Sequence, residues 1–118
     1  MCHVLVIEDE WFISDYISEL ASEAGATSTS IAATEREAVQ AARDHAPDII
    51  LSDVNLLEGT GPRAVATILG ERGPIPVIFI TATPRDCEPC DPQSVVLSKP
   101  INRMAVIETF RQLVPGHL

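Results

Sequence analysis

Short apolar runs alternate along the chain with longer segments in which apolar and polar residues recur at helical spacing. Continuous apolar runs occur at residues 4–7, 49–51 and 77–80, and such runs are typical of strands that are covered on both faces. Weaker runs at residues 27–33 and 94–97 are expected nearer the edges of the sheet. Strands that alternate with helices indicate an α/β fold built on a parallel sheet.

Four segments carry the signals of amphipathic helices. The first has apolar residues on one face at helical spacing and meets Gly25 as its stop. The second opens at Thr34 with a capping box that reaches Glu37, and the third has Pro62 in its first turn. The helices are therefore expected over about residues 10–24, from residue 34, from residue 61 and over about residues 102–114.

Residues 84–93 break this alternation. The segment contains three prolines and no apolar stripe, and prolines inside a helix remove backbone hydrogen bonds. Where a further crossover helix belongs, the sequence predicts a loop or at most one turn. Cys87 and Cys90 have the spacing of redox and half-zinc sites, but Cys2 and His3 lie at the opposite end of a parallel sheet. Four converging ligands are therefore not expected.

Length and charge narrow the function classes. A chain of 118 residues fits one domain, 1–118, and its 46% hydrophobic residues are enough for a real core. Eight Lys and Arg against seventeen Asp and Glu give a net charge of -9, which disfavours direct binding to nucleic acid or to an anionic membrane. The first residues resemble neither a signal peptide nor a membrane span, and three cysteines suggest no disulfide framework, so a cytoplasmic location is expected.

Polar side chains follow the predicted strands at one edge of the sheet. Glu8 and Asp9 follow the first strand, Asp53 the third, Thr81 the fourth and Lys99 the fifth. Ligands of parallel α/β sheets bind outside the carboxyl ends of the strands, so these side chains are expected to converge. Each signal alone has an ordinary explanation, such as a helix start, a turn or a surface lysine. Their joint placement at four strand ends predicts a site.

The chemistry of these groups fits phosphoryl transfer. Crowded carboxylates repel one another unless a cation relieves them, and Mg²⁺ prefers oxygen ligands. Asp53 is the expected nucleophile, since an aspartate can form an acyl phosphate. Thr81 can donate a hydrogen bond to a phosphoryl oxygen, and Lys99 can neutralise another.

Ordered motifs across nearly the whole chain resemble the receiver domains of two-component response regulators. The acidic pair after the first strand, the phosphoacceptor strand with its turn, the strand that ends in Thr-Ala and the Lys-Pro pair are all present in the family's order. They lie at Leu5–Glu10, Asp48–Leu56, Pro76–Ala82 and Ser98–Pro100.

The resemblance implies a flavodoxin-like, doubly wound sheet of five parallel strands in the order 2-1-3-4-5. The prolines of residues 84–93 predict a degenerate fourth helix in that fold. The resemblance also implies a phosphoryl group passed to Asp53 from a sensor histidine kinase or a histidine phosphotransfer protein, and a cis Lys99-Pro100 bond. It implies that Asn55 and Thr83 flank the path of the water that attacks the phosphate. The implied magnesium site comprises Glu8 through water, Asp9, Asp53 and the backbone carbonyl of Asn55.

Departures from the family pattern narrow the resemblance. Leu57 replaces the usual proline after the phosphorylation turn, and Val96 replaces the aromatic residue that swings inward on activation. The stretch from Thr81 to Lys99 is also shorter than is usual in the family. In these features the chain resembles the receivers of alphaproteobacterial general-stress-response regulators and stand-alone receivers. The same features predict a response in the proline-rich segment 84–92 in place of an aromatic switch.

Three alternatives remain open. The chain could be a fragment of a larger regulator whose effector follows Leu118, because Val114-Pro115-Gly116 resembles the start of a linker. It could be a small phosphatase, but Asn55 stands where such enzymes need a second aspartate. It could bind flavin, but Glu8 to Glu10 occupy the place of a phosphate loop. The leading hypothesis is a phosphorylatable signalling module with no output domain in this chain. It is expected to be a monomer or weak homodimer, with a possible downstream protein target.

Overall fold

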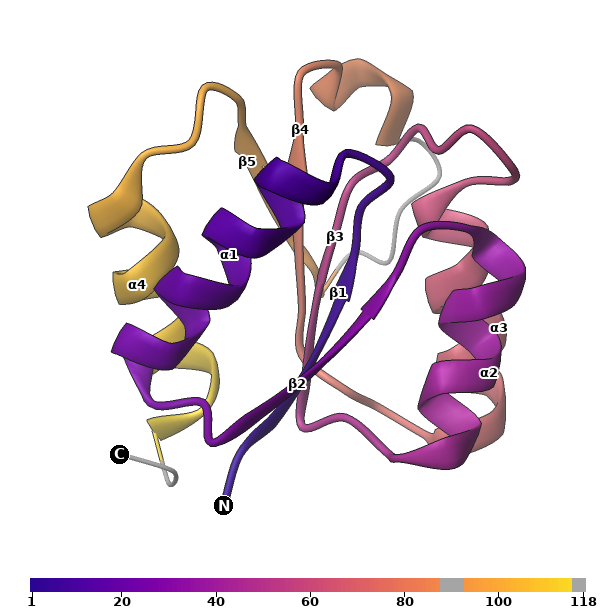
Figure 1. Cartoon of the computed structure of the whole chain (residues 1–118), viewed down its shortest axis with the longest axis horizontal. Coiled ribbons are helices and arrows are strands. Elements are labelled where there is room, and N and C mark those ends of the chain that lie inside the picture. Colours follow the sequence, from indigo (N-terminus) through magenta and orange to yellow (C-terminus); the bar gives the residue numbers. More distant parts are fainter. Residues whose placement is uncertain (88–92, 116–118) are drawn as a thin grey trace.

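The computed structural model describes residues 1–87 and 93–115. Within these residues, five strands alternate with four α-helices and one short 3₁₀ helix (Figure 1). In chain order they are β1 His3–Ile7, α1 Trp11–Ala24, β2 Ser28–Ala32, α2 Glu35–Asp44, β3 Ile49–Ser52, α3 Gly61–Arg72, β4 Val77–Thr81, η1 Pro84–Cys87, β5 Val95–Ser98 and α4 Arg103–Leu113.

The five strands form one parallel sheet in the order β2-β1-β3-β4-β5, which confirms the predicted topology. Every residue of β1, β3 and β4 is buried, as their continuous apolar runs predict for strands covered on both faces. The weaker apolar runs correspond to β2 and β5 at the two edges of the sheet, where several residues are exposed.

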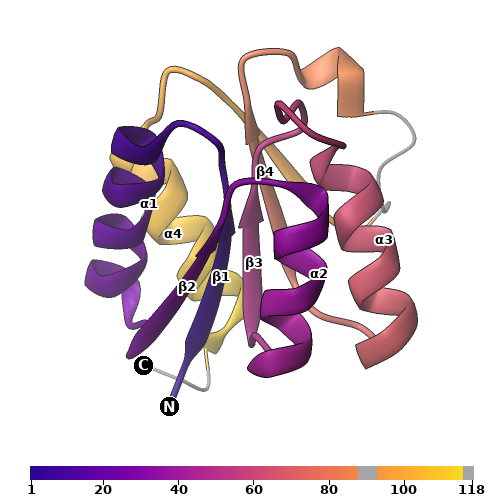
Figure 2. The same cartoon turned by 45° about the vertical axis from the view of Figure 1, so that its right-hand side comes forward.

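Two layers of helices cover the sheet, α1 and α4 on one face and α2 and α3 on the other (Figure 2). Phe110 and Leu20 anchor the apolar cluster under α1 and α4, and Phe79 and Ile68 anchor the cluster under α2 and α3. Each fully buried side chain of this size stabilises the fold by about 1.5–3 kcal/mol. The two clusters hold β1 and β3 rigidly between them, and the loops that follow these strands begin on this fixed base.

Local signals set the helix ends. Thr34 Oγ1 accepts a hydrogen bond from the Glu37 backbone amide at 3.1 Å, as the capping box predicts. The Glu37 carboxylate returns to the amide of Ala33 at 2.9 Å, one residue before the position that the box prescribes. Thr60 caps α3 in the same way, through the amide of Arg63.

The segment after β4 begins with a single 3₁₀ turn, Pro84–Cys87, so the prediction of at most one turn is confirmed for its described part. The rest of the predicted loop, including Cys90 of the Cys-x-x-Cys pair, lies in residues 88–92, outside the described residues. The Lys99-Pro100 bond is cis. Among the helices that the structure describes, none combines the length and apolarity needed to cross a bilayer.

Candidate functional site

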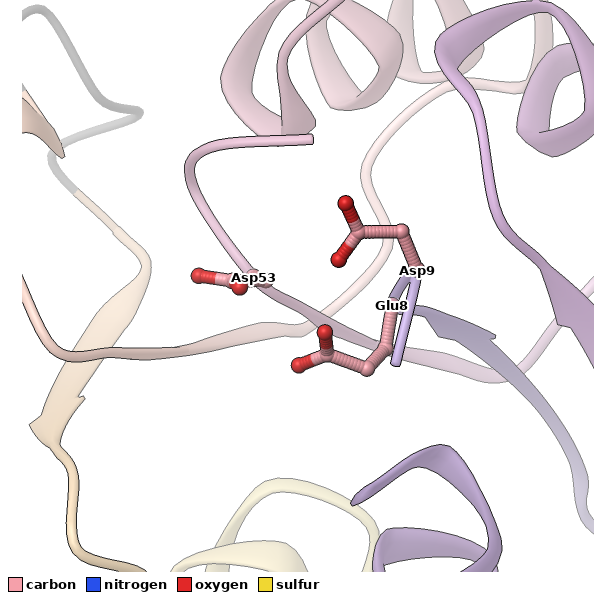
Figure 3. Close-up of side chains that lie close together, drawn as sticks. All are labelled: Glu8, Asp9 and Asp53. Carbon is pink, nitrogen blue, oxygen red and sulfur yellow. The ribbon is translucent and has the colours of Figure 1, made fainter. Parts of the chain in front are cut away.

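Three carboxylates meet at the carboxyl end of the sheet (Figure 3). Glu8 and Asp9 follow β1 and Asp53 follows β3, and these two strands are neighbours in the sheet. One oxygen from each carboxylate lies within 4.8 Å of the others. The convergence that the sequence predicts from strand ends is therefore present.

Lys99 lies between two of these carboxylates. Its Nζ donates to Glu8 Oε1 at 2.9 Å and to Asp53 Oδ2 at 3.2 Å. Glu8 is only 2% exposed, and this burial raises the pKa of its carboxyl while the hydrogen bond from Lys99 opposes the rise. Burial would lower the pKa of Lys99, but its bonds to Glu8 and its attraction to Asp53 prevail and raise it.

Removing this ion pair should make the stability of the fold depend on pH. Replacing Lys99→Met leaves Glu8 buried without its cation, so the pKa of Glu8 should rise further. The folded variant then binds a proton more tightly than the unfolded chain, and its free energy of unfolding should fall as pH rises above the ordinary glutamate value of 4.5. Near neutral pH we expect a loss of about 3 kcal/mol, as for other broken buried pairs.

Urea denaturation without divalent ions, at about pH 5 and about pH 8, measures this loss. Lys99→Arg is the matched control, since it keeps a cation beside Glu8. A loss of stability in Lys99→Met that is equal at both pH values would contradict the assignment of Glu8 as the titrating group.

Backbone amides hold the two less buried carboxylates. Asp9 Oδ2 accepts from the amide of Leu57 at 2.9 Å, and Asp53 Oδ1 accepts from the amide of Val54 at 2.7 Å. The loop between β3 and α3 therefore contacts the acidic pair after β1. These bonds fix the carboxylates in place.

Gly61 lets α3 begin very close to the site. A Cβ at this position would lie 1.8 Å from the carbonyl oxygen of Asp53 and 2.4 Å from Ser52 Oγ. The Gly61 amide donates to the carbonyl oxygen of Val54 at 2.9 Å, and Ser52 Oγ donates to the carbonyl oxygen of Asp53 at 2.7 Å. The absence of a side chain is what permits this approach.

A second group of polar side chains joins β4 to the β3–α3 loop. Thr81, at the end of β4, is buried, and its Oγ1 accepts from the Thr83 amide at 3.0 Å. Asn55 Nδ2 donates to Thr83 Oγ1 at 2.8 Å and to Asp86 Oδ2 at 3.1 Å. Thr81 and Asn55 are therefore connected through Thr83.

The donor set fits a hard divalent cation. Glu8, Asp9 and Asp53 offer oxygens, and an octahedral Mg²⁺ with bonds of about 2.0–2.1 Å brings its oxygen ligands to within about 3–4 Å of one another. The three carboxylate oxygens, all within 4.8 Å, need only small movements to reach that geometry. Among the described residues this is the one acidic group with metal-binding spacing.

Comparison with known proteins agrees with this arrangement. Residues 4–111 match the family model described as the response regulator receiver domain. The chain is a response regulator receiver domain.

Curated relatives of this receiver domain are longer proteins. It is 35% identical over 82 residues to the phyllosphere-induced regulator PhyR of Methylorubrum extorquens, a match that covers 69% of this chain and 31% of that protein. It is 32% identical over 82 residues to a protein-glutamate methylesterase/protein-glutamine glutaminase of Halobacterium salinarum, with 70% of this chain and 23% of that protein covered. The receiver domain thus spans less than a third of these relatives.

Solved structures show the same fold along almost the whole receiver domain. The PhyR receiver domain of Erythrobacter litoralis has a TM-score of 0.84 and 33% identity, with 98% of this chain and 92% of that chain covered. A mutant of the anti-anti-sigma factor PhyR of Bartonella quintana has a TM-score of 0.81 and 33% identity, with 98% and 49% covered. The chemotaxis protein CheY4 of Vibrio cholerae has 0.82 and 25%, with 96% and 98% covered. PhyR proteins thus occur among both the curated relatives and the solved structures.

The sequence analysis did not predict the roles of two residues at the receiver domain's site. It placed Gly61 at the start of a helix, but the Gly-Pro pair gave no sign of the close contact with Asp53. Asp86 lies in the segment without periodicity, where no pattern shows which way a side chain faces. Its position five residues after Thr81, just beyond a proline, is the signal that could have drawn attention to it.

Proposed function

We propose that Asp53 accepts a phosphoryl group from a phosphohistidine of a sensor histidine kinase or histidine phosphotransfer protein. The observation that carries this proposal is the position of Asp53 beside Lys99, Glu8 and Asp9 at one end of the sheet. Membership of the receiver family supports it independently. No observation favours the phosphatase or flavin alternatives.

The side chains have complementary roles in the proposed reaction. A carboxylate oxygen of Asp53 attacks phosphorus, the P–N bond to the donor imidazole breaks, and the imidazole leaves with that electron pair. Lys99 already contacts Asp53 Oδ2 and neutralises negative charge on the incoming oxygens. Thr81 donates a hydrogen bond to one of them. Positioning and charge neutralisation are the main sources of catalysis in phosphoryl transfer.

The proposed cofactor is Mg²⁺, which would supply positive charge that favours binding of the phosphoryl group at this acidic site. Asp9 and Asp53 would bind it directly, with the carbonyl of Asn55, and Glu8 would act through water. Lys99 balances part of the acidic charge through its pair with Glu8 at 2.9 Å. This pair reduces the repulsion among the carboxylates.

Chemical phosphorylation tests the proposal without a partner protein. Acetyl phosphate with Mg²⁺ should add one phosphoryl group to the wild-type chain, and EDTA should prevent the addition, because the acidic group then repels the donor. Intact-mass measurement reads the result, and replacing Mg²⁺ with K⁺ at equal ionic strength controls for screening. Equal labelling with and without a divalent ion would refute the proposal that Mg²⁺ is the cofactor.

An exposed aromatic pair supports a protein donor. Trp11 is 77% exposed and Phe12 58% exposed at the start of α1, and their rings meet edge to face with centroids 6.0 Å apart. Trp11 lies two residues from Asp9, so a protein that covers it also reaches the site. Aromatic residues of this kind are enriched among binding hot spots.

We predict that Trp11→Ala slows phosphotransfer from a cognate protein donor at least tenfold, since hot-spot side chains contribute about 2 kcal/mol or more. Labelling by acetyl phosphate should stay at the wild-type rate. Ile31→Ala is the control, because Ile31 is an apolar residue exposed by 53% on the edge strand β2. Equal slowing with both donors would show that Trp11 supports the site and not the partner.

Several broader features belong to the same proposal. Residues 1–118 form one receiver domain, in the cytoplasm, as a monomer or weak homodimer. Its output goes to a protein target and not directly to nucleic acid or membrane, in line with the net charge of -9. The anti-anti-sigma factor PhyR matched above supports a protein target.

A further inference from the structure

The 3₁₀ helix η1 is connected to the site by a chain of four polar side chains. Asp86 Oδ2 lies 3.1 Å from Asn55 Nδ2, which lies 2.8 Å from Thr83 Oγ1. Thr83 Oγ1 lies 3.2 Å from Thr81 Oγ1. The chain therefore runs from an exposed carboxylate on η1 to the buried hydroxyl at the end of β4.

Asp86 determines the direction of these hydrogen bonds at the outer end. An ionised carboxylate can only accept, so the Asn55 atom that faces Asp86 must be the amide nitrogen. The second hydrogen of that amide is then donated to Thr83 Oγ1. With both hydrogens of Asn55 committed, Thr83 Oγ1 is fixed as an acceptor toward Asn55.

At the inner end of the chain either hydroxyl could donate, and the lone pair of Thr83 Oγ1 already used by Asn55 favours Thr83 as the donor. Thr83 retains its own hydroxyl hydrogen, and Thr81 Oγ1 at 3.2 Å is the hydroxyl that can accept it. Thr81 Oγ1 also accepts from the Thr83 amide at 3.0 Å. Two accepted hydrogen bonds fill the oxygen of Thr81 and leave its hydroxyl hydrogen for an acceptor outside the chain.

We infer that Asp86 is a positioning residue that makes Thr81 a hydrogen-bond donor to the phosphoryl group on Asp53. This inference rests on the proposed function. Asp86 touches neither Asp53 nor the phosphoryl group, and it acts through Asn55 and Thr83. Hydrogen bonds that run in one direction polarise one another, so the donor at the inner end is strengthened as well as oriented.

Within residues 1–87 and 93–115, the hydrogen bond found for the Asp86 carboxylate is the one to Asn55 Nδ2. The backbone amide of Asp86 donates to the carbonyl oxygen of Thr83 at 2.9 Å, which closes the turn of η1. That bond involves no side-chain atom, so Asp86→Asn keeps the turn. An asparagine at this position can donate as well as accept, so the Asn55 amide is free to reverse and the chain loses its direction.

Single-turnover labelling by acetyl phosphate with Mg²⁺ tests the inference. We expect Asp86→Asn to be labelled about tenfold more slowly than wild type. Loss of a direct donor costs about 10²–10³ in rate, and Asp86 acts only through two other residues. Asp44→Asn is the charge-matched control, since Asp44 is exposed at the end of α2 and accepts from Gln40. It should be labelled at the wild-type rate.

A double-mutant cycle separates positioning from a general effect of charge. In a Thr83→Ala background the chain is already broken, so Asp86→Asn should cause no further slowing. Asp86→Glu keeps an acceptor-only group and should retain most of the wild-type rate. Slowing by Asp86→Asn that is equal in both backgrounds would overturn the inference, and so would a wild-type rate in Asp86→Asn.

A measurement without phosphate or metal reads the direction of the chain itself. In ¹⁵N spectra, the two side-chain amide protons of Asn55 should both shift in Asp86→Asn, and neither should shift in Asp44→Asn. Unchanged signals in Asp86→Asn would overturn the inference. If the wild-type chain takes up no phosphate, the proposed function is overturned. The Asn55 signals would then test only the direction of the hydrogen bonds.

Discussion

Asp53→Asn should take up no phosphate from acetyl phosphate or from a protein donor, under conditions that label the wild-type chain fully. The neutral amide of asparagine is a very poor nucleophile for phosphorus, and it lacks the negative charge that attracts a cation. The variant should remain folded, because Lys99 keeps its bond of 2.9 Å to Glu8 when the contact to Asp53 is weakened.

Intact-mass measurement and circular dichroism on the same sample check both parts of this expectation. Asp44→Asn serves again as the charge-matched control and should be labelled like wild type. Labelling that persists in Asp53→Asn would assign the phosphate to another residue, and peptide mapping would then locate it.

Gly61→Ala should destabilise the chain by about 3 kcal/mol, at the upper end of what overpacking a close contact costs. The added methyl group would lie 1.8 Å from the carbonyl oxygen of Asp53, which is backbone and cannot turn aside. We expect a fall in Tm of about 10 °C or more. Labelling should slow as well, because the shift needed to relieve this contact moves Asp53.

Gly70→Ala is the matched control within the same helix. A Cβ at Gly70 has open space around it, and alanine is a better helix former than glycine by about 0.5–1 kcal/mol. This variant should therefore be slightly more stable than wild type, and its labelling should not change. If urea denaturation gave the same stability for both variants, the close contact described between Gly61 and the backbone of Asp53 would be contradicted.

The sequence predicted the parts of the fold that depend on burial. Runs such as Val77 to Ile80 are apolar on both faces because both faces are covered, and they became the central strands. Val96 stands in a weaker run and is 39% exposed on the edge strand β5. The strand order came from the resemblance to receivers, since periodicity does not specify which strands are neighbours.

The carboxylates of the site were predictable for a similar reason. Asp9 and Asp53 follow neighbouring parallel strands, whose carboxyl ends meet at one edge. The pairing of Lys99 with Glu8 was not predictable, because a side-chain rotamer depends on what surrounds it in space. The contact between Asp86 and Asn55 was not predictable for the same reason, because it depends on the 3₁₀ turn that brings the Asp86 carboxylate to Asn55.

The bond between Lys99 and Glu8 joins residues 91 positions apart in the chain. During synthesis, Asp53 leaves the ribosome long before β5 and Lys99 do. A nascent or truncated chain that ends before residue 99 therefore carries the aspartate without its lysine, and Glu8 lacks the cation that makes its burial tolerable. Contacts of such long separation slow folding, because loop-closure entropy is lost before they form. Under the proposed function, a kinase would therefore find Asp53 with its lysine in place only after nearly the whole domain has been made.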